Sequence, residues 1–207
     1  MRVELLKKGS FRTATWAGGT TTELFIHPGT SDCGARDFEV RVSSATVEIE
    51  ESVFSDFKGY VRHIAPLEGG MRLRHEGHRE VSLAPFEADS FDGAWCTRSY
   101  GKCVDFNLIH RDGWRGGIIA LGTDGRLDCP VGGFTGIYVV SDGTTVAVVS
   151  EGEAQCLSAD RGDFILVDRV DDEGGAKCTA ATRGAEGILA IAAWASPICR
   201  RNESGRP

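Results

Sequence analysis

Short runs in which polar and apolar residues alternate recur along most of the chain, and this period of two restricts its fold more than any other feature. Residues 39–43 alternate in this way, and two further runs flank the polar turn at residues 75–78. Successive side chains of a strand point to opposite faces, so the alternation is typical of strands with one buried face. No comparable helical period emerges. The sequence therefore predicts an all-β protein of the sandwich or barrel type.

A polar, glycine-containing stretch at residues 111–117 divides the chain into two halves that both show this strand pattern. In the second half, Asp142-Gly143 separates two apolar runs and predicts a hairpin. Two consecutive β-units of similar size indicate a duplicated barrel. The expected parts are an N-terminal unit with a candidate ligand pocket at residues 1–112, a C-terminal unit at residues 113–199, and a disordered tail at residues 200–207.

The composition argues against several partners and locations. The net charge is −7 and no long basic stripe occurs, which disfavours nucleic acid and anionic membranes as partners. The first residues lack the apolar core of a secretory signal, and no apolar run is long enough to span a membrane. We therefore expect a cytoplasmic protein. None of its seven cysteines forms a C-x-x-C pair, so we expect reduced thiols that mostly serve as small core residues.

The strongest indication of a binding site is a pair of polar residues inside an apolar strand. Asp105 and Asn107 stand two residues apart in the run at residues 103–109, so they share one face, whereas Val104 and Phe106 take the other. Buried polar groups need partners, which come either from the protein or from a ligand. If this polar face points inward, a carboxylate and an amide lie where a ligand could meet them.

The segment around Gly18-Gly19 could form the mouth of such a site. Its glycines permit a tight turn or a close backbone approach. In the strand that follows, Glu23 and Phe25 are expected to share a face. Trp16 would then supply an apolar wall and Glu23 a polar anchor, while the alternative is a simple hairpin with an exposed glutamate.

Two further segments could supply cations and aromatic walls. Arg41 and Ser43 share a strand face, and Arg62 follows a cluster of aromatic and polar residues. A planar guanidinium is suited to a carboxylate, although a surface arginine beside core phenylalanines would give the same pattern. A buried ion network without any ligand is a second alternative. The segment contributes Phe54, Ser55, Phe57 and Arg62 as candidate site residues.

The histidines do not indicate a metal site. His75 and His78 lie on either side of the Glu76-Gly77 turn tip rather than at alternate positions of one strand. Metal-binding cupin barrels usually carry H-x-H, a later glutamate and a further histidine, and that set does not occur in this sequence. We therefore expect no metal and no cofactor.

Taken together, these segments resemble the HutD/Ves family over roughly residues 10 to 112. No single motif is specific, but their order and spacing are. The chain carries Ala17-Gly18-Gly19 where many members have a longer Asn-Gly-Gly-Gly stretch, so the contacts of that loop depart from the family pattern. The matching set comprises Trp16-x-Gly-Gly-x-Thr-x-Glu23, Arg41-x-Ser43-x-Ala45, Phe54-Ser55-x-Phe57-x-Gly59-x-x-Arg62, Phe91-x-Gly93 and Asp105-Phe106-Asn107.

The resemblance implies a bicupin, with two cupin-like β-barrels of the double-stranded β-helix or jelly-roll type in one chain. HutD members are tied to histidine utilisation, where they are thought to bind a breakdown product such as N-formylglutamate and restrain the pathway. Ves members are tied to stress response. Neither association implies an enzymatic activity.

From these observations we expect a non-enzymatic regulator that binds a small carboxylate-bearing metabolite in its first unit. Arg62 would hold the ligand carboxylate, with Arg41 as a second cation, and the aromatic residues would form the apolar wall. One alternative is a cupin enzyme, an isomerase or a metal-dependent oxygenase, with Asp105 as general base. Another is a scaffold that acts through a protein partner. The chain could also form a homodimer.

Overall fold

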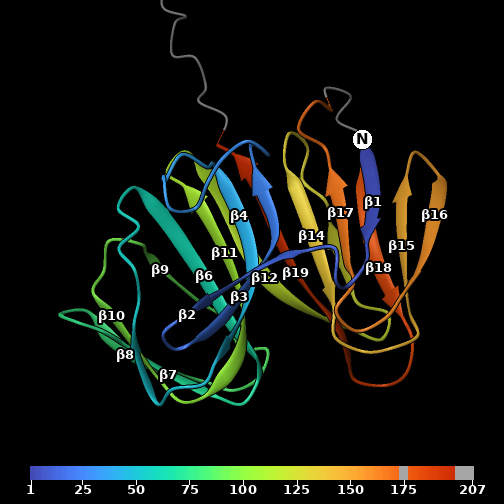
Figure 1. The fold of residues 1–207 in the computed structure, drawn as a ribbon. Coiled ribbons are helices and arrows are strands. Elements are labelled where there is room, and N and C mark those ends of the chain that lie inside the picture. Colours follow the sequence, from blue (N-terminus) through green and yellow to red (C-terminus); the bar gives the residue numbers. More distant parts are fainter. Residues whose placement is uncertain (173–176, 199–207) are drawn as a thin grey trace, which may run out of the picture.

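The protein is built from strands alone. A computed structural model describes residues 1–172 and 177–198, and these ranges contain nineteen strands and no helix. Accordingly, these ranges hold no helix that could cross a membrane. Figure 1 shows the strands as two groups that lie side by side. The all-β prediction is confirmed, whereas the tail predicted at residues 200–207 lies outside the described residues.

The first group is a pair of antiparallel sheets, which we call the first sheet pair. Its six-stranded sheet has the order β2-β3-β4-β11-β6-β9 and its four-stranded sheet the order β5-β10-β7-β8. Buried side chains of both sheets, among them Ile64 and Leu73, pack in one cluster between them. The strands are β2 (Arg12–Trp16), β3 (Gly19–His27), β4 (Val40–Val47), β5 (Glu51–Val53), β6 (Tyr60–Glu68), β7 (Met71–His75), β8 (Arg79–Leu83), β9 (Asp89–Asp92), β10 (Thr97–Tyr100) and β11 (Cys103–Arg111).

The second sheet pair consists of a five-stranded and a four-stranded sheet. The orders are β1-β17-β14-β19-β12 and β13-β18-β15-β16. Ile137, Val146 and Ile165 belong to the apolar cluster that fills the space between these sheets. The strands are β1 (Arg2–Leu6), β12 (Trp114–Gly122), β13 (Arg126–Asp128), β14 (Phe134–Val139), β15 (Thr144–Ser150), β16 (Glu153–Ala159), β17 (Phe164–Asp168), β18 (Cys178–Arg183) and β19 (Ile188–Pro197).

Strand β1 begins the chain but belongs to the second sheet pair. It pairs with β17, with Val3 opposite Val167 and Leu5 opposite Ile165. Val3 and Leu5 pack against the core of the second pair. All other strands before residue 112 belong to the first sheet pair. The partner of β1 lies near the other end of the sequence, and no local pattern indicates the pairing.

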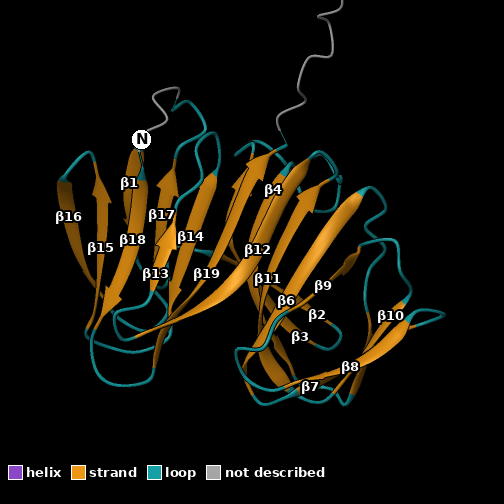
Figure 2. Cartoon of the chain, turned by 180° about the vertical axis from the view of Figure 1, so that it is seen from behind, coloured by secondary structure: helices purple, strands orange, loops and turns teal. Residues whose placement is uncertain are grey.

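The two sheet pairs pack against each other through their larger sheets, so the molecule has four layers. Phe106 and Leu108 of β11 belong to the same buried cluster as Phe164 and Ile191 of the five-stranded sheet. Figure 2 shows β11 and β12 next to each other where the two groups meet. Strand β11 is consequently buried on both faces, one against the second sheet pair and the other toward the interior of the first.

Two turns predicted from the sequence have different outcomes. The turn at residues 75–78 joins β7 to β8 as an antiparallel hairpin. The hairpin predicted at Asp142-Gly143 is wrong, because β14 and β15 lie in different sheets. This turn is held by the neighbouring β16–β17 connection, where Arg161 N–H donates to Asp142 Oδ1 at 2.9 Å. An Asp-Gly turn of the kind found in hairpins therefore joins strands of two facing sheets here.

Gly19, at the start of β3, is required by a close backbone approach. Its φ is 148°, and a Cβ at this position would lie 1.9 Å from the carbonyl oxygen of Thr46. The neighbouring Gly18 is covered by Trp16, whose ring would be 2.2 Å from a Cβ there. The two glycines thus allow the β2–β3 hairpin to lie close against β4.

Candidate functional site

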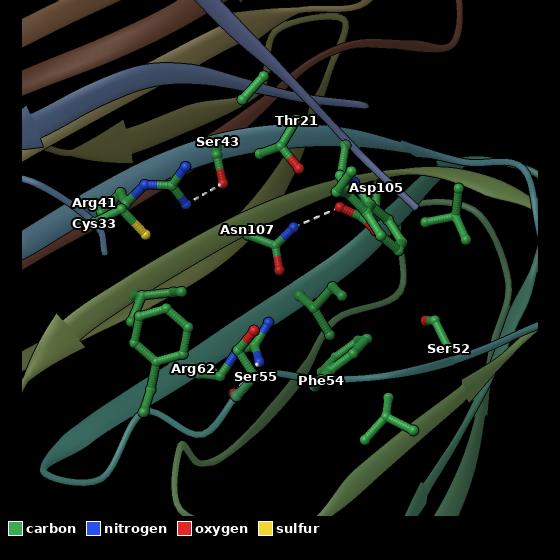
Figure 3. Close-up of a pocket in the computed structure, with 18 of the residues that line it drawn as sticks. Thr21, Cys33, Arg41, Ser43, Ser52, Phe54, Ser55, Arg62, Asp105 and Asn107 are labelled. Atoms are coloured by element: carbon green, nitrogen blue, oxygen red, sulfur yellow. Dashed lines mark hydrogen bonds between the residues drawn. The ribbon is translucent and has the colours of Figure 1, made fainter. Parts of the chain in front are cut away.

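A cavity of about 430 Å³ opens inside the first sheet pair, between the six-stranded sheet and the loop that follows β5. Figure 3 shows its lining, with polar side chains of β4, β6 and β11 directed into one space. Nine of the ten residues predicted from the sequence to contact a ligand line this cavity: Trp16, Arg41, Ser43, Phe54, Ser55, Phe57, Arg62, Asp105 and Asn107. Glu23 is the tenth and does not line it.

Strand register places the polar side chains of the cavity in adjacent rows. Ile109 of β11 lies directly between Arg41 of β4 and Arg62 of β6. In the next row, Asn107 lies opposite Ser43. Because inward-facing residues alternate along each strand, these groups share the cavity side while their neighbours face the second sheet pair. The polar face of β11 therefore does point inward, as its sequence indicated.

Arg62 is a buried cation with unsatisfied hydrogen-bonding capacity. Its Cζ lies 4.4 Å from the ring centroid of Phe54, and NH1 donates to the carbonyl oxygen of Ser55 at 3.4 Å. Its Nε is buried without a hydrogen-bond partner. None of the ion pairs within residues 1–172 and 177–198 includes Arg62. A buried charge of this kind is costly unless it is paired, so the arrangement favours an anionic ligand.

Burial shifts the pKa values of Arg62 and Asp105 in opposite directions, and the shift of Asp105 reduces the negative charge in the cavity. Loss of water lowers the pKa of Arg62 to about 10, which leaves it charged at neutral pH, and the nearby Asp105 opposes this decrease. Loss of water also raises the pKa of Asp105 to about 7, although the charge of Arg62 and a hydrogen bond from Asn107 lower it. Near neutral pH, Asp105 thus carries only part of a negative charge.

Asn107 presents a hydrogen-bond acceptor to the cavity. Its Nδ2 donates to Asp105 Oδ1, and its own Oδ1 is buried without a partner. An amide oxygen in this position can accept an N–H group from a ligand. The cavity therefore contains an unpaired donor at Arg62 and an unpaired acceptor at Asn107.

Glu23 acts on the cavity indirectly, by orienting Arg41. Arg41 Nε donates to Glu23 Oε2 at 2.8 Å, and its NH1 donates to Ser43 Oγ at 3.0 Å. The expectation that Glu23 and Phe25 share a face is wrong. The register of β3 against β4 shifts between these two residues, and Phe25 packs against Phe134 of the second sheet pair. A β-bulge thus reverses the alternation halfway along the strand.

Among the cavity residues that the sequence did not indicate, two come from a loop. Arg36 lies with its Cζ 3.6 Å above the ring centroid of Phe57, and its NH1 donates to the carbonyl oxygen of Cys33. Both Arg36 and Cys33 line the cavity from the loop between β3 and β4. Strand periodicity carries no information about a loop, so this third arginine became apparent only from the fold.

None of the five histidines lines the cavity, and the side chains of His63, His75 and His110 bond to neighbouring protein groups. His75 Nε2 contacts Asp89 Oδ2 at 2.9 Å, and His63 Nε2 contacts His110 Nε2 at 3.1 Å. Within the described part of the chain, no three His, Cys, Asp or Glu side chains gather in a way that could hold a metal ion. The expected absence of a metal and of a cofactor stays a prediction.

Three solved structures are similar to this chain along most of its length. A conserved protein of unknown function, PA5104 from Pseudomonas aeruginosa PAO1, is 26% identical with a TM-score of 0.77 and covers 95% of this chain and 100% of its own. HutD from Pseudomonas fluorescens SBW25 is 22% identical with a TM-score of 0.72 and the same coverage. Oxalate decarboxylase from Lactobacillus farciminis is 8% identical with a TM-score of 0.64, covering 94% of this chain and 86% of its own.

The likeness to oxalate decarboxylase shows that the fold is cupin-like. At 8% identity this likeness concerns the fold alone. No curated protein matches this chain in sequence. The HutD family matches residues 8–186, which includes most strands of both sheet pairs. The resemblance drawn from residues 10 to 112 thus extends well into the second half. By this match, the chain belongs to the HutD family.

Proposed function

We propose that this protein is a bicupin whose first sheet pair is a cupin-like barrel that binds a small carboxylate-bearing metabolite, and that it regulates rather than catalyses. The observation that carries the proposal is Arg62, a buried guanidinium with an unpaired Nε in a cavity of about 430 Å³. Arg36 and Arg41 also line this cavity, and Glu23 is paired with Arg41. An anion of a few heavy atoms fits this volume and this charge.

The arrangement favours a ligand with an N–H group as well as a carboxylate. Arg62 offers its unpaired Nε–H to the carboxylate, while the unpaired Oδ1 of Asn107 accepts the N–H. Phe54 and Phe57 provide the apolar wall between the cations. N-formylglutamate carries carboxylates and a formamide N–H, so it is the ligand we select for the test. The link to histidine utilisation rests on membership of the HutD family.

The experiment is calorimetric titration of the protein with N-formylglutamate, with formate as the smallest carboxylate probe. HutD from Pseudomonas fluorescens was solved in a formate condition. Arg62→Met keeps an unbranched stem against Phe54 and removes the charge. Hydrogen bonds to charged groups contribute about 1.5–3 kcal/mol, so the variant should bind about 10- to 100-fold more weakly.

The matched control is Arg72→Met on the outer side of the four-stranded sheet. Arg72 also lies over an aromatic ring, with its Cζ 4.1 Å from the centroid of Tyr100, but it is exposed and paired with Glu80. This variant should bind like the wild type. Equal affinity of the wild type and Arg62→Met for N-formylglutamate would show that the proposed carboxylate position is wrong.

A second candidate function is supported by Asp105. A carboxyl group whose pKa burial raises to about 7 beside a buried cation could serve as a general base in a cupin enzyme such as an isomerase. Asp105→Asn would then bind the ligand but convert none of it, whereas a pure binding protein converts none in either form. Product analysis of the wild type after prolonged incubation with N-formylglutamate separates the two functions.

The scaffold role, the homodimer, the cytoplasmic location and the stress association of Ves stay predictions.

A further inference from the structure

Three sulfur-bearing side chains meet in the second sheet pair, away from the cavity described above. Cys129 follows β13, Cys178 begins β18, and Met1 precedes β1. The Cys178 Sγ lies 3.5 Å from the Met1 Sδ. Both views place the N-terminus at the same end of the second sheet pair as the beginning of β18. The cluster therefore lies at one end of this pair, between its two sheets.

The two cysteines are cross-strand neighbours. Strands β13 and β18 are antiparallel with Leu127 opposite Ala180 and Asp128 opposite Thr179, so the next position brings Cys129 opposite Cys178. The backbone N–H of Cys129 donates to the carbonyl oxygen of Cys178 at 2.8 Å, which continues the ladder. Directly opposite residues project from the same face with Cβ atoms about 4.5–5.5 Å apart. Two thiols held in this way can contact one ion without a change in the backbone.

The surroundings of the thiols contain an unsatisfied polar group. Cys129 and Cys178 are 3% and 1% exposed, and both belong to the apolar core of the second sheet pair. Thr135 of β14 is fully buried and its Oγ1 lacks a hydrogen-bond partner. This hydroxyl lies beside the Cys129 thiol. Met1 is about half exposed and thus leaves a route from solvent.

We propose that Cys129, Cys178 and Met1 form a binding site for a soft monovalent cation, Cu(I), with two thiolate ligands and one thioether ligand. Soft sulfur ligands select Cu(I), whereas imidazole and carboxylate groups suit other metals. The Thr135 hydroxyl can donate a hydrogen bond to the Cys129 thiolate once its proton has left. Structural zinc sites need four ligands, and the described residues bring no His, Asp or Glu to this pair.

Metal uptake at this site exchanges protons for the cation. Each thiol loses its proton, two Cu–S(thiolate) bonds and one Cu–S(thioether) bond form, and the oxidation state of copper does not change. Because each bound cation displaces two thiol protons, the apparent affinity for Cu(I) should increase with pH.

The test is an anaerobic competition for Cu(I) between the reduced full-length protein and the chelator bathocuproine disulfonate, with X-ray absorption to identify the ligands. We expect one Cu(I) per chain with three sulfur neighbours. Cys129→Ala and Cys178→Ala should each lose this copper. The matched control is the double variant Cys96→Ser/Cys156→Ser, which removes two exposed thiols and should retain one Cu(I) per chain.

Thermal unfolding with Ag(I) distinguishes loss of the site from loss of the fold. Ag(I) is a soft cation that, unlike Cu(I), is not oxidised by air, and a ligand that binds the folded state more tightly than the unfolded chain raises the unfolding temperature. Ag(I) should raise the unfolding temperature of the wild type and of the exposed-thiol control. It should not raise the unfolding temperature of Cys129→Ala, provided that this variant is folded. Retention of copper by both buried-cysteine variants, a first shell of nitrogen or oxygen, or tighter binding of Zn(II) than of Cu(I) would each overturn the proposal.

Discussion

Replacing Asp105 by asparagine tests whether the cavity of the first sheet pair carries a carboxyl group that is neutral for most of the acidic pH range. Burial raises the pKa of Asp105 from 3.8 to about 7. The folded protein therefore binds this proton more tightly than the unfolded chain does. The contribution of the proton to stability is fully present below pH 3.8 and is lost as the pH rises toward 7.

The magnitude follows from the same values. One pKa unit corresponds to about 1.4 kcal/mol, so at pH 8 the ionised carboxylate lowers the free energy of unfolding by on the order of 3 to 4 kcal/mol relative to the protonated group. The side-chain amide introduced by Asp105→Asn would resemble the protonated carboxyl group in shape and cannot ionise. The variant should therefore match the wild type near pH 4 and exceed its stability at pH 8 by about that amount.

The assay is urea unfolding of the wild type and Asp105→Asn at intervals from pH 4 to pH 8. The difference between the two curves should change by about 1.4 kcal/mol per pH unit in the middle of this range, which corresponds to one proton. Taking the difference removes the contribution of other titrating groups. Glu153→Gln, at an exposed position of β16, serves as the control for replacement of a carboxylate by an amide. Parallel curves for the wild type and Asp105→Asn would refute the reasoning.

Three further predictions concern the fold. Gly19→Ala should lower the free energy of unfolding by more than about 2 kcal/mol because its Cβ would meet Thr46 O, whereas Gly29→Ala, with nothing within 4 Å, should change it by less than about 1 kcal/mol in the same urea assay. Phe106→Ala should cost about 3–5 kcal/mol, since the ring is fully buried between the two sheet pairs; a cost below about 1 kcal/mol would contradict this packing. Burial lowers the pKa of His63 to about 4, so acidification below its ordinary pKa of 6.5 favours the unfolded state, and His63→Gln should reduce the loss of stability between pH 6 and pH 4. An imidazole resonance of His63 that titrates near pH 6.5 in NMR spectra would show that this side chain is not buried as described.

The sequence predicted the polar half of the site because that half lies on strands. Period-two alternation determines which residues of β4, β6 and β11 share a face, so Arg41, Arg62 and Asp105 could be grouped before any fold was known. The opposite face of β11 is apolar, and the sequence does not reveal what it packs against. Phe106 and Leu108 are buried against the second sheet pair, and alternation cannot distinguish the interior of one sheet pair from the contact between two.

Other parts of the fold depend on distant pairing or on a local irregularity. The bulge in β3 places Phe25 on the opposite face from Glu23, and a simple alternation rule misses it. Arg36 reaches the cavity from a loop, where no period applies. The sulfur cluster joins Met1 to Cys178, and neither residue is distinctive within its own segment. In each case, the decisive information is the contact partner rather than the residue type.

The position of β1 has a consequence for how the chain folds during its synthesis. Arg2–Leu6 leaves the ribosome before the other described strands, but its partner strand in the described part of the chain is Phe164–Asp168. The strands of the first sheet pair lie between residues 12 and 111. They can associate before the partner strand of β1 has been synthesised. Val3 and Leu5 therefore remain unpaired until residues 164–168 have emerged. Such long-range closure slows folding and prolongs exposure of a strand edge to other chains. A fragment that begins at residue 113 should consequently aggregate, and a synthetic peptide of residues 1–8 should restore part of its solubility.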